Sequence, residues 1–183
     1  MPLRAEQGIS ISVAPPPPGE PTGPILAVEF ASQEQSNWCW AACCQMVFHF
    51  LAVNKLSQCD LASEEFACSC CSAPSSPQCN KPLWPDGVYR HYHVPFVQKA
   101  QALTFVQVKE QIDANRPVEA YIEWNGSGAH VILLAGYYDN GDVVVMDPLS
   151  DGPARKSLDS VRDADGMGQW TMTYVDLGGR VGV

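Results

Sequence analysis

The chain has 183 residues, of which 20 are acidic and 11 are basic, so its formal net charge is −9. This length suits one sizeable hydrophobic core better than two full domains. The few Lys and Arg residues are scattered and form no basic stripe, so we expect neither nucleic acid nor an anionic membrane surface as a partner. No segment approaches the roughly 18 consecutive apolar residues that a membrane span requires.

Eight cysteines are many for this length, and all of them lie in the first half of the chain. Exported proteins use such cysteines as disulfide staples, whereas cytosolic proteins seldom do. We therefore expect a secreted or exported protein. The first residues, however, have no apolar core typical of a signal peptide. Two interpretations stay open: the chain is a processed or engineered form, or its export uses another route.

Residues 1–27 are predicted to form a proline-rich extended arm or a propeptide remnant, and residues 28–183 to form the folded domain. Pro15–Pro18 and the later Gly23-Pro24 pair exclude a helix and a central strand. The alternating segment Ile9–Val13 is compatible with an edge strand. The position of the arm, directly before the folded domain, also suggests a strap that covers part of that domain.

The first helix is predicted from Trp38 to Val53, because no Gly or Pro interrupts this segment and Ser36 and Asn37 are good N-caps. The segment is apolar nearly all round, which indicates a central, buried helix. Three further segments are predicted before the strands: a short helix at 58–66, an irregular Cys/Ser/Pro-rich stretch at 68–85, and a helix at 103–115 with Val106, Ile112 and Leu103 facing inward.

Beyond Pro117 the pattern changes to strands, which are predicted at 118–124, 129–138, 143–147 and 169–177. The segment Asp139–Asp142 contains Asn-Gly, which tolerates the positive φ angles of a tight hairpin turn. Helices followed by an antiparallel sheet indicate an α+β fold of two packed halves.

Cys39 is a candidate nucleophile because it stands at the start of the buried helix. There the unpaired backbone N–H groups and the helix dipole favour a thiolate over a thiol. For a cysteine taken alone, a small buried residue or half of a disulfide is the commoner role. His130, Asp147 and Gln33 together favour the catalytic interpretation.

His130 follows a Gly/Ser loop that includes Gly128 and stands at the head of an apolar strand. The glycines let a substrate backbone approach closely. The hairpin that turns at Asn140-Gly141 brings Asp147 to the same end of the ladder as His130. A carboxylate there would fix the tautomer of the imidazole and stabilise its charged form. Otherwise Asp147 is a strand-end residue before a proline.

Gln33, six positions before Cys39, is a candidate oxyanion-hole donor together with the backbone N–H of Cys39, and Gln35 is a weaker candidate. Loss of one such donor typically lowers the rate about 10²–10³-fold. Trp40 and Trp124 are predicted to shape the wall of the cleft, and Gly128 to admit the substrate.

Gln33 and the run Asn37-Trp-Cys39-Trp-Ala-Ala-Cys43 resemble the active-site signature of papain-like cysteine peptidases. The detail is most similar to the bacterial branch that includes plant-pathogen avirulence proteases and staphopain-like enzymes. Further matching pieces are Ser57-Gln-Cys59, Cys70-Cys71, Cys79-Asn80, Arg116-Pro117-Val118, Gly128-Ala-His130, Gly136-Tyr137 and Asp147-Pro148. The resemblance covers about residues 30–148. Well-known papain relatives carry asparagine where this chain has Asp147.

The resemblance implies a papain-like fold in which the helix of Cys39 lies across a cleft from His130 in the sheet half. It implies peptide-bond hydrolysis through a Cys39–His130–Asp147 triad and a covalent acyl-enzyme, with Gln33 in the oxyanion hole. It implies a peptide or protein substrate, no cofactor and no metal, and we expect a monomer. Two alternatives remain: the same triad in a glutamine deamidase, transamidase or isopeptidase, and a non-catalytic domain stapled by cysteines.

The remaining candidates are weaker. His91 and His93 would share one face of a strand as a metal pair, but surface histidines are the commoner case. The cysteines at 68–79 lack the paired spacing of a zinc site, so disulfides are preferred. With Cys39 free, at most three bridges form, and the expected leftover thiol is Cys43 or Cys44. His49 is expected to be a packed core residue.

Overall fold

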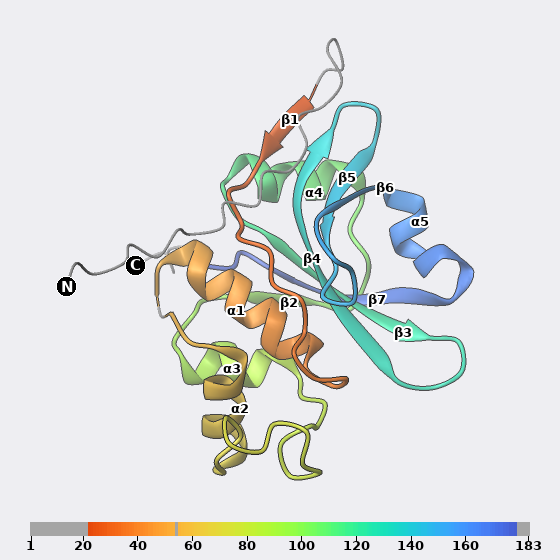
Figure 1. The fold of residues 1–183 in the computed structure, drawn as a ribbon. Coiled ribbons are helices and arrows are strands. Elements are labelled where there is room, and N and C mark those ends of the chain that lie inside the picture. The colour runs from red at the N-terminus through yellow and green to blue at the C-terminus, as the bar shows by residue number, and fades with distance from the viewer. Residues whose placement is uncertain (1–21, 54, 179–183) are drawn as a thin grey trace, which may run out of the picture.

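The computed structural model describes residues 22–53 and 55–178, so the edge strand predicted at 9–13 lies outside the described residues. Three helices gather on one side of the molecule in Figure 1, and an antiparallel sheet with its own covering helices occupies the other. The predicted α+β arrangement of two packed halves is therefore confirmed.

The helical half contains α1 (Cys39–Leu51), α2 (Gln58–Phe66) and α3 (Pro85–His91). Helix α1 is buried along most of its length and packs against the sheet, where the Cys43 thiol donates to the Val131 carbonyl at 3.4 Å. Its predicted central position is correct, and α2 has the predicted bounds. Helix α3 was not predicted, because its short sequence begins with proline and contains Gly87, both typical of an irregular segment.

The start of α1 differs from the prediction. Its N-cap is Trp38, which makes no side-chain cap hydrogen bond. The expected caps instead bind Asn80: the Asn37 amide donates to the Asn80 carbonyl at 3.0 Å, and the Asn80 amide donates to the Ser36 hydroxyl at 2.9 Å. The two polar side chains before the helix thus tie it to the cysteine-rich segment instead of capping it.

The cysteine-rich segment is held by two disulfides, Cys59–Cys71 and Cys70–Cys79. One leftover thiol besides Cys39 was expected, either Cys43 or Cys44, but both of these cysteines are free and buried in α1. Cys68 is also free, which the sequence did not indicate. The bridges replace regular secondary structure as the source of order in this segment.

Within residues 22–53 and 55–178 the sheet has seven strands: β1 (Thr22–Ile25), β2 (Val97–Lys99), β3 (Val118–Trp124), β4 (Ala129–Tyr138), β5 (Asp142–Met146), β6 (Ala154–Ser157) and β7 (Gly168–Val175). Their order is β2-β7-β3-β4-β5-β6, and β1 pairs with the far end of β4. All pairings are antiparallel. The bounds of β3 and β4 match the prediction, and the short strands β1, β2 and β6 are additional.

Strand β1 lies within the predicted arm of residues 1–27. The Leu26 N–H donates to the Ala135 carbonyl at 2.7 Å, and Leu26 itself is buried. The last residues of the predicted arm are therefore part of the sheet edge. The suggestion that the arm is a strap over part of the folded domain concerns mainly residues before 22, outside the described range.

Strand β4 is covered on both faces, which explains its nearly continuous apolar sequence. Val131 faces the same cavity as Trp40 in the helical half. The next residue along, Ile132, faces Val161 of α5 (Leu158–Arg162) on the opposite side. His130, at the open end of this strand, borders both the cavity shared with Trp40 and the space on the side of Val161.

Helix α4 (Phe105–Asp113) packs against β4 and begins at a capping box of Thr104 and Gln107. Val108 and Ile112 face inward, and Leu103 is buried as predicted. Val106, however, is 63% exposed, so its predicted inward orientation is wrong. The buried residues are four apart, and Val106 lies outside that helical stripe.

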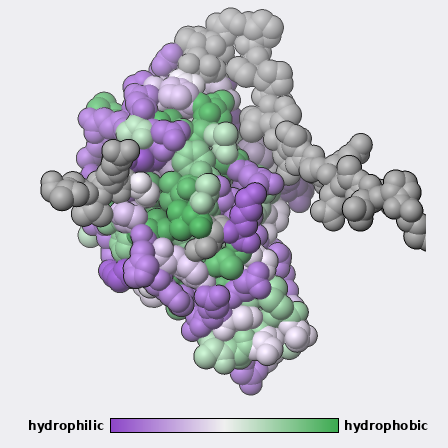
Figure 2. Space-filling model, turned by 90° about the vertical axis from the view of Figure 1, so that its left-hand side faces the viewer, coloured by the Kyte–Doolittle hydropathy of each residue, from purple (hydrophilic) through white to green (hydrophobic). Residues whose placement is uncertain are grey.

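Among the described residues, no helix combines the length and the apolar character needed to cross a membrane. The face shown in Figure 2 has apolar side chains in its middle and hydrophilic side chains around them. The remaining η1 turn (Ala164–Gly166) follows α5.

Candidate active site

The candidate nucleophile occupies the first position of α1. Cys39 is half-buried, and the next residue, Trp40, is buried and donates through its indole N–H to the Lys81 carbonyl at 3.1 Å. The backbone N–H groups of the first helical turn have no partners within the helix and point toward its start. The Cys39 sulfur therefore lies where the helix dipole favours negative charge.

The imidazole of His130 is held between a carboxylate and an aromatic ring. Its Nε2 donates to Asp147 Oδ1 at 2.7 Å, and the Trp124 ring stacks on it at 5.8 Å between centroids. Asp147 directly follows β5, where Met146 pairs with Leu133, so the predicted hairpin brings it beside the head of β4. The same Oδ1 accepts the Leu149 N–H at 2.9 Å.

The charges of His130 and Asp147 follow from this geometry. Burial acts to lower the pKa of His130, but its hydrogen bonds with Asp147 and with Cys39 outweigh burial and raise the pKa to about 9. Burial acts to raise the pKa of Asp147, but the bonds from His130 and from the Leu149 N–H hold that pKa below its ordinary value. An imidazolium and a carboxylate therefore coexist at neutral pH.

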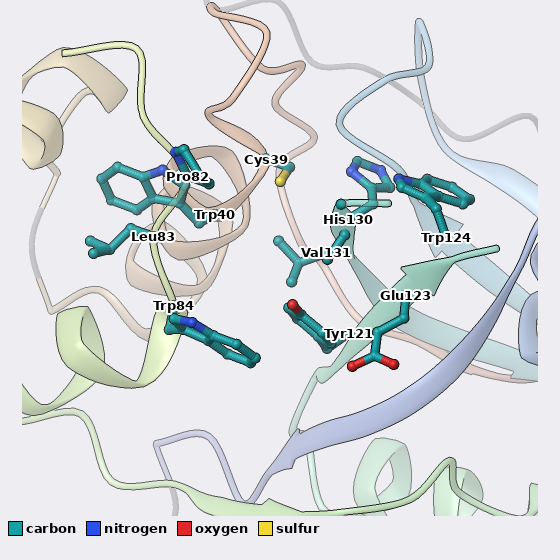
Figure 3. A pocket seen from close by; sticks show the side chains of 12 residues that line it. Cys39, Trp40, Pro82, Leu83, Trp84, Tyr121, Glu123, Trp124, His130 and Val131 are labelled. Atoms are coloured by element: carbon teal, nitrogen blue, oxygen red, sulfur yellow. The ribbon is translucent and has the colours of Figure 1, made fainter. Parts of the chain in front are cut away.

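Cys39 and His130 meet at a cavity of about 500 Å³ between the two halves. Because Nε2 of His130 is bound to Asp147, Nδ1 is the ring nitrogen left to exchange a proton with Cys39, whose influence also raises the pKa of His130. Figure 3 shows the sulfur facing the gap and the imidazole on the opposite wall. The predicted juxtaposition of these residues across a groove is present.

The cavity has one wall from each half, as Figure 3 shows. The predicted residues Trp40, Trp124 and Gly128 all line it. Gly128 has φ of +86°, a conformation that residues with a side chain rarely adopt. The remaining lining residues are Pro82, Leu83, Trp84, Tyr121, Glu123, Ala129 and Val131.

Sequence reasoning missed the pair that spans this cavity, Trp84 and Tyr121, whose rings stack at 4.6 Å between centroids. Tyr121 and Glu123 alternate along β3 and both face the cavity. That period of two was visible in the sequence and could have identified them. No local signal marked Trp84, which stands in the irregular segment.

Gln33 lies outside the lining of the cavity, yet it is firmly positioned. Its backbone N–H donates to the Pro148 carbonyl at 2.9 Å, next to Asp147. Its side-chain Nε2 donates to the Gln35 carbonyl at 2.8 Å, while its Oε1 is buried without a hydrogen-bond partner. An amide nitrogen carries two hydrogens, so one donor remains after the bond to Gln35.

Gln58, the first residue of α2, holds the segment around Gln33 and was also missed. Its buried amide donates to the Ser32 carbonyl at 2.8 Å and accepts the Glu34 N–H at 2.9 Å. These two bonds clamp the residues on either side of Gln33. Only the resemblance at Ser57-Gln-Cys59 pointed near this position.

The histidine pair predicted on a strand is not on a strand. His91 ends α3, where its Nδ1 lies 2.8 Å from Glu65 Oε1, and His93 follows with φ of +55°. A helix end separates the two rings, so alternation along a strand does not apply. His49 lies on α1 with its Nε2 buried, but a quarter of its side chain is exposed, so it is not the fully packed core residue that was expected.

Two groups of three potential metal ligands occur among the described residues, Cys68/Cys70/Cys79 and Cys59/Asp60/Cys71. Each of them contains one of the two disulfides, which leaves fewer thiolates for a metal than the residue count suggests.

A helix-borne cysteine facing a carboxylate-bound histidine between a helical and a sheet half defines a papain-like cysteine protease. The family comparison agrees: residues 25–175 match the Peptidase_C39 like family, so the chain belongs to that family. This membership argues against the non-catalytic alternative.

One solved structure similar to this chain is described as the crystal structure of a double glycine motif protease from an AMS/PCAT transporter in complex with the leader peptide. The two share 15% identity with a TM-score of 0.52 over 84% of this chain and 96% of that one, which supports the fold. A comparison with curated protein sequences finds no significant match.

Proposed function

We propose that the protein hydrolyses peptide bonds through Cys39, His130 and Asp147. The observation that carries this proposal is the 2.7 Å bond from His130 Nε2 to Asp147 Oδ1, with Cys39 and His130 lining the same cavity. This arrangement gives a nucleophile, a base and an orienting group in the order that acyl transfer needs.

In the proposed reaction the Cys39 thiolate attacks the scissile carbonyl carbon, while His130 carries the proton as an imidazolium. His130 then donates this proton to the leaving amine, and the acyl group stays on sulfur as a thioester. His130 next takes a proton from water, whose oxygen attacks the thioester and releases the acid. Asp147 keeps the ring oriented and stabilises its positive charge.

Gln33 is the proposed side-chain donor of the oxyanion hole, alongside the backbone N–H of Cys39. Its remaining amide hydrogen and its clamped backbone support this role. Pre-positioned donors stabilise the oxyanion because they need no reorganisation during the reaction. On this basis Gln33→Ala lowers kcat about 10²–10³-fold with a smaller change in KM.

The proposed substrate is an extended peptide. The apolar and aromatic wall of Trp40, Leu83 and Trp84 suits an apolar side chain of such a peptide. The leader peptide in the similar solved structure supports peptide binding by this architecture.

We also propose that the protein belongs to the avirulence-protease and staphopain-like branch and acts as a bacterial effector. The motif residues around Cys39 and His130 support this proposal. Export is proposed as well, supported by the two disulfides, since such bridges persist in oxidising compartments. A monomer that binds no nucleic acid is the proposed solution state.

A peptide library read by mass spectrometry tests the proposed function. We expect cleaved products with the wild type and none above background with Cys39→Ala. Cys43→Ala, which removes a buried thiol of the same helix, is the matched control and should retain cleavage. Conversion of glutamine to glutamate in uncleaved peptides would instead identify a deamidase, and equal product in wild type and Cys39→Ala would refute the proposal.

A further inference from the structure

Three sulfur atoms meet within the cysteine-rich segment. Cys68 Sγ lies 3.3 Å from Cys70 Sγ and 3.4 Å from Cys79 Sγ, and these last two are joined in a disulfide. A free thiol is therefore in contact with both atoms of a bridge. Thiol–disulfide exchange begins when a thiolate approaches a disulfide sulfur in line with the bond that breaks, and Cys68 reaches that line by a small movement from its position beside the bridge.

The three cysteines differ in their access to solvent. Cys70 is fully buried and Cys79 is 2% exposed, so a reagent in solution cannot reach their bridge directly. Cys68 is partly exposed. It is thus the one sulfur of this group that faces both the solvent and the bridge.

We propose that Cys68 makes this group an exchange site for low-molecular-weight thiols. The Cys68 thiolate attacks Cys79 Sγ, so that a Cys68–Cys79 bond forms and the Cys70–Cys79 bond breaks. The electron pair leaves on Cys70 Sγ, which takes up a proton. The buried bridge has then moved to a pair that includes an accessible sulfur.

An external thiolate next attacks the Cys68 sulfur, forms a mixed disulfide there and expels the Cys79 thiolate. A second external thiol attacks the outer sulfur of the mixed disulfide and restores the Cys68 thiol. In sum, two external thiols are oxidised to one disulfide, and one protein disulfide is reduced to two thiols.

The exchange site is connected to the cavity through Cys79. The Cys79 carbonyl accepts the Trp38 indole N–H at 2.9 Å, and the neighbouring Asn80 binds Asn37. The following residues include Leu83 and Trp84 of the cavity wall. Reduction of the bridge releases this wall from its anchor, which weakens substrate binding.

The direct test measures reduction of each bridge in the native protein. Wild type and Cys68→Ser are exposed to dithiothreitol, quenched with acid, alkylated after denaturation and mapped by mass spectrometry. We expect the Cys70–Cys79 bridge to be reduced about tenfold more slowly in Cys68→Ser. The more exposed Cys59–Cys71 bridge is the internal control, with equal rates in both proteins.

Equal rates for the Cys70–Cys79 bridge would overturn the proposal. A misfolded variant would expose this bridge and speed its reduction, so misfolding cannot produce the expected result. A second measurement needs no variant: acid trapping of the wild type held at mildly alkaline pH should yield peptides linked through Cys68–Cys79. Finding Cys70–Cys79 linkage alone would refute exchange.

The effect on the cavity rests on the proposed function and has its own readout. After limited reduction, KM for a peptide substrate should rise in the wild type and change less in Cys68→Ser. Absence of hydrolysis in every sample would count against the proposed function, whereas the bridge-mapping result would stand unaffected.

Discussion

At the scale of single residues, opposing effects on the pKa of His130 determine whether its imidazole is charged. Burial disfavours its charged form, yet the bonds with Asp147 and Cys39 raise the pKa to about 9. The folded-state pKa thus exceeds the unfolded value of about 6.5. Proton binding by His130 therefore stabilises the fold fully below about pH 6.5, and this contribution is lost as the pH rises through about 9.

The pH profile of hydrolysis tests whether the pKa of His130 is raised in this way. The active ion pair needs the imidazolium, so kcat/KM of the wild type should fall as the pH rises through about 9. In Asp147→Asn the loss of the carboxylate should move this alkaline limb down by about 1–3 units. Asp142→Asn, at the opposite end of β5 from Asp147 and bound to Arg155, is the control. An unshifted limb in Asp147→Asn would contradict the assigned role of Asp147.

At the scale of elements, the cavity depends on contacts between the segment before α3 and strand β3. Trp84 is 50% exposed and stacks on Tyr121, so one irregular segment and one regular strand build a common aromatic surface. Trp84 is the N-cap of α3 but makes no side-chain cap hydrogen bond. Its ring is therefore available for substrate contact without a part in starting the helix.

Trp84→Ala should raise KM for peptide substrates about tenfold, which corresponds to about 1.4 kcal/mol of lost binding. We expect kcat to change little, because Cys39 and His130 keep their positions. Val106→Ala on α4, another exposed apolar residue, is the comparison variant. Steady-state kinetics decide the matter, and a loss confined to kcat would show that Trp84 does not bind substrate.

At the scale of the whole molecule, a buried acid links the two halves. The Tyr89 hydroxyl of α3 donates to Glu119 Oε2 of β3 at 2.7 Å, and both residues are fully buried. Burial raises the pKa of Glu119 to about 8, against the smaller lowering effect of the Tyr89 bond. Glu119 is therefore mainly neutral at pH 7 in the folded protein, while it is ionised in the unfolded chain.

Because the pKa of Glu119 differs between the folded and the unfolded chain, the free energy of unfolding depends on pH. Since the folded-state pKa is raised, the contribution of Glu119 is fully present below about pH 4.5 and is lost as the pH rises through about 8. Glu119→Gln should remove about 3–5 kcal/mol of this variation in unfolding free energy. Denaturant melts across this range measure it, with the exposed Glu110→Gln as control. Equal pH dependence in Glu119→Gln and wild type would disprove the interpretation.

Most of the candidate active site could be predicted from the sequence because its signals are local. A cysteine opening an apolar helix and a histidine heading an apolar strand each depend on neighbouring residues. Asp147 was reached from His130 through one tight turn, where Gly141 has φ of +96° as that turn requires. These short-range patterns predicted the fold class, the candidate nucleophile and its candidate partners.

The tertiary structure alone decided the features built from distant residues. Asn37 binds Asn80 instead of capping α1, and Trp84 stacks on Tyr121. Cys68 contacts the Cys70–Cys79 bridge. The physical reason is that such contacts depend on how irregular segments are folded back by disulfides and packing. Neither periodicity nor propensity along the chain carries that information.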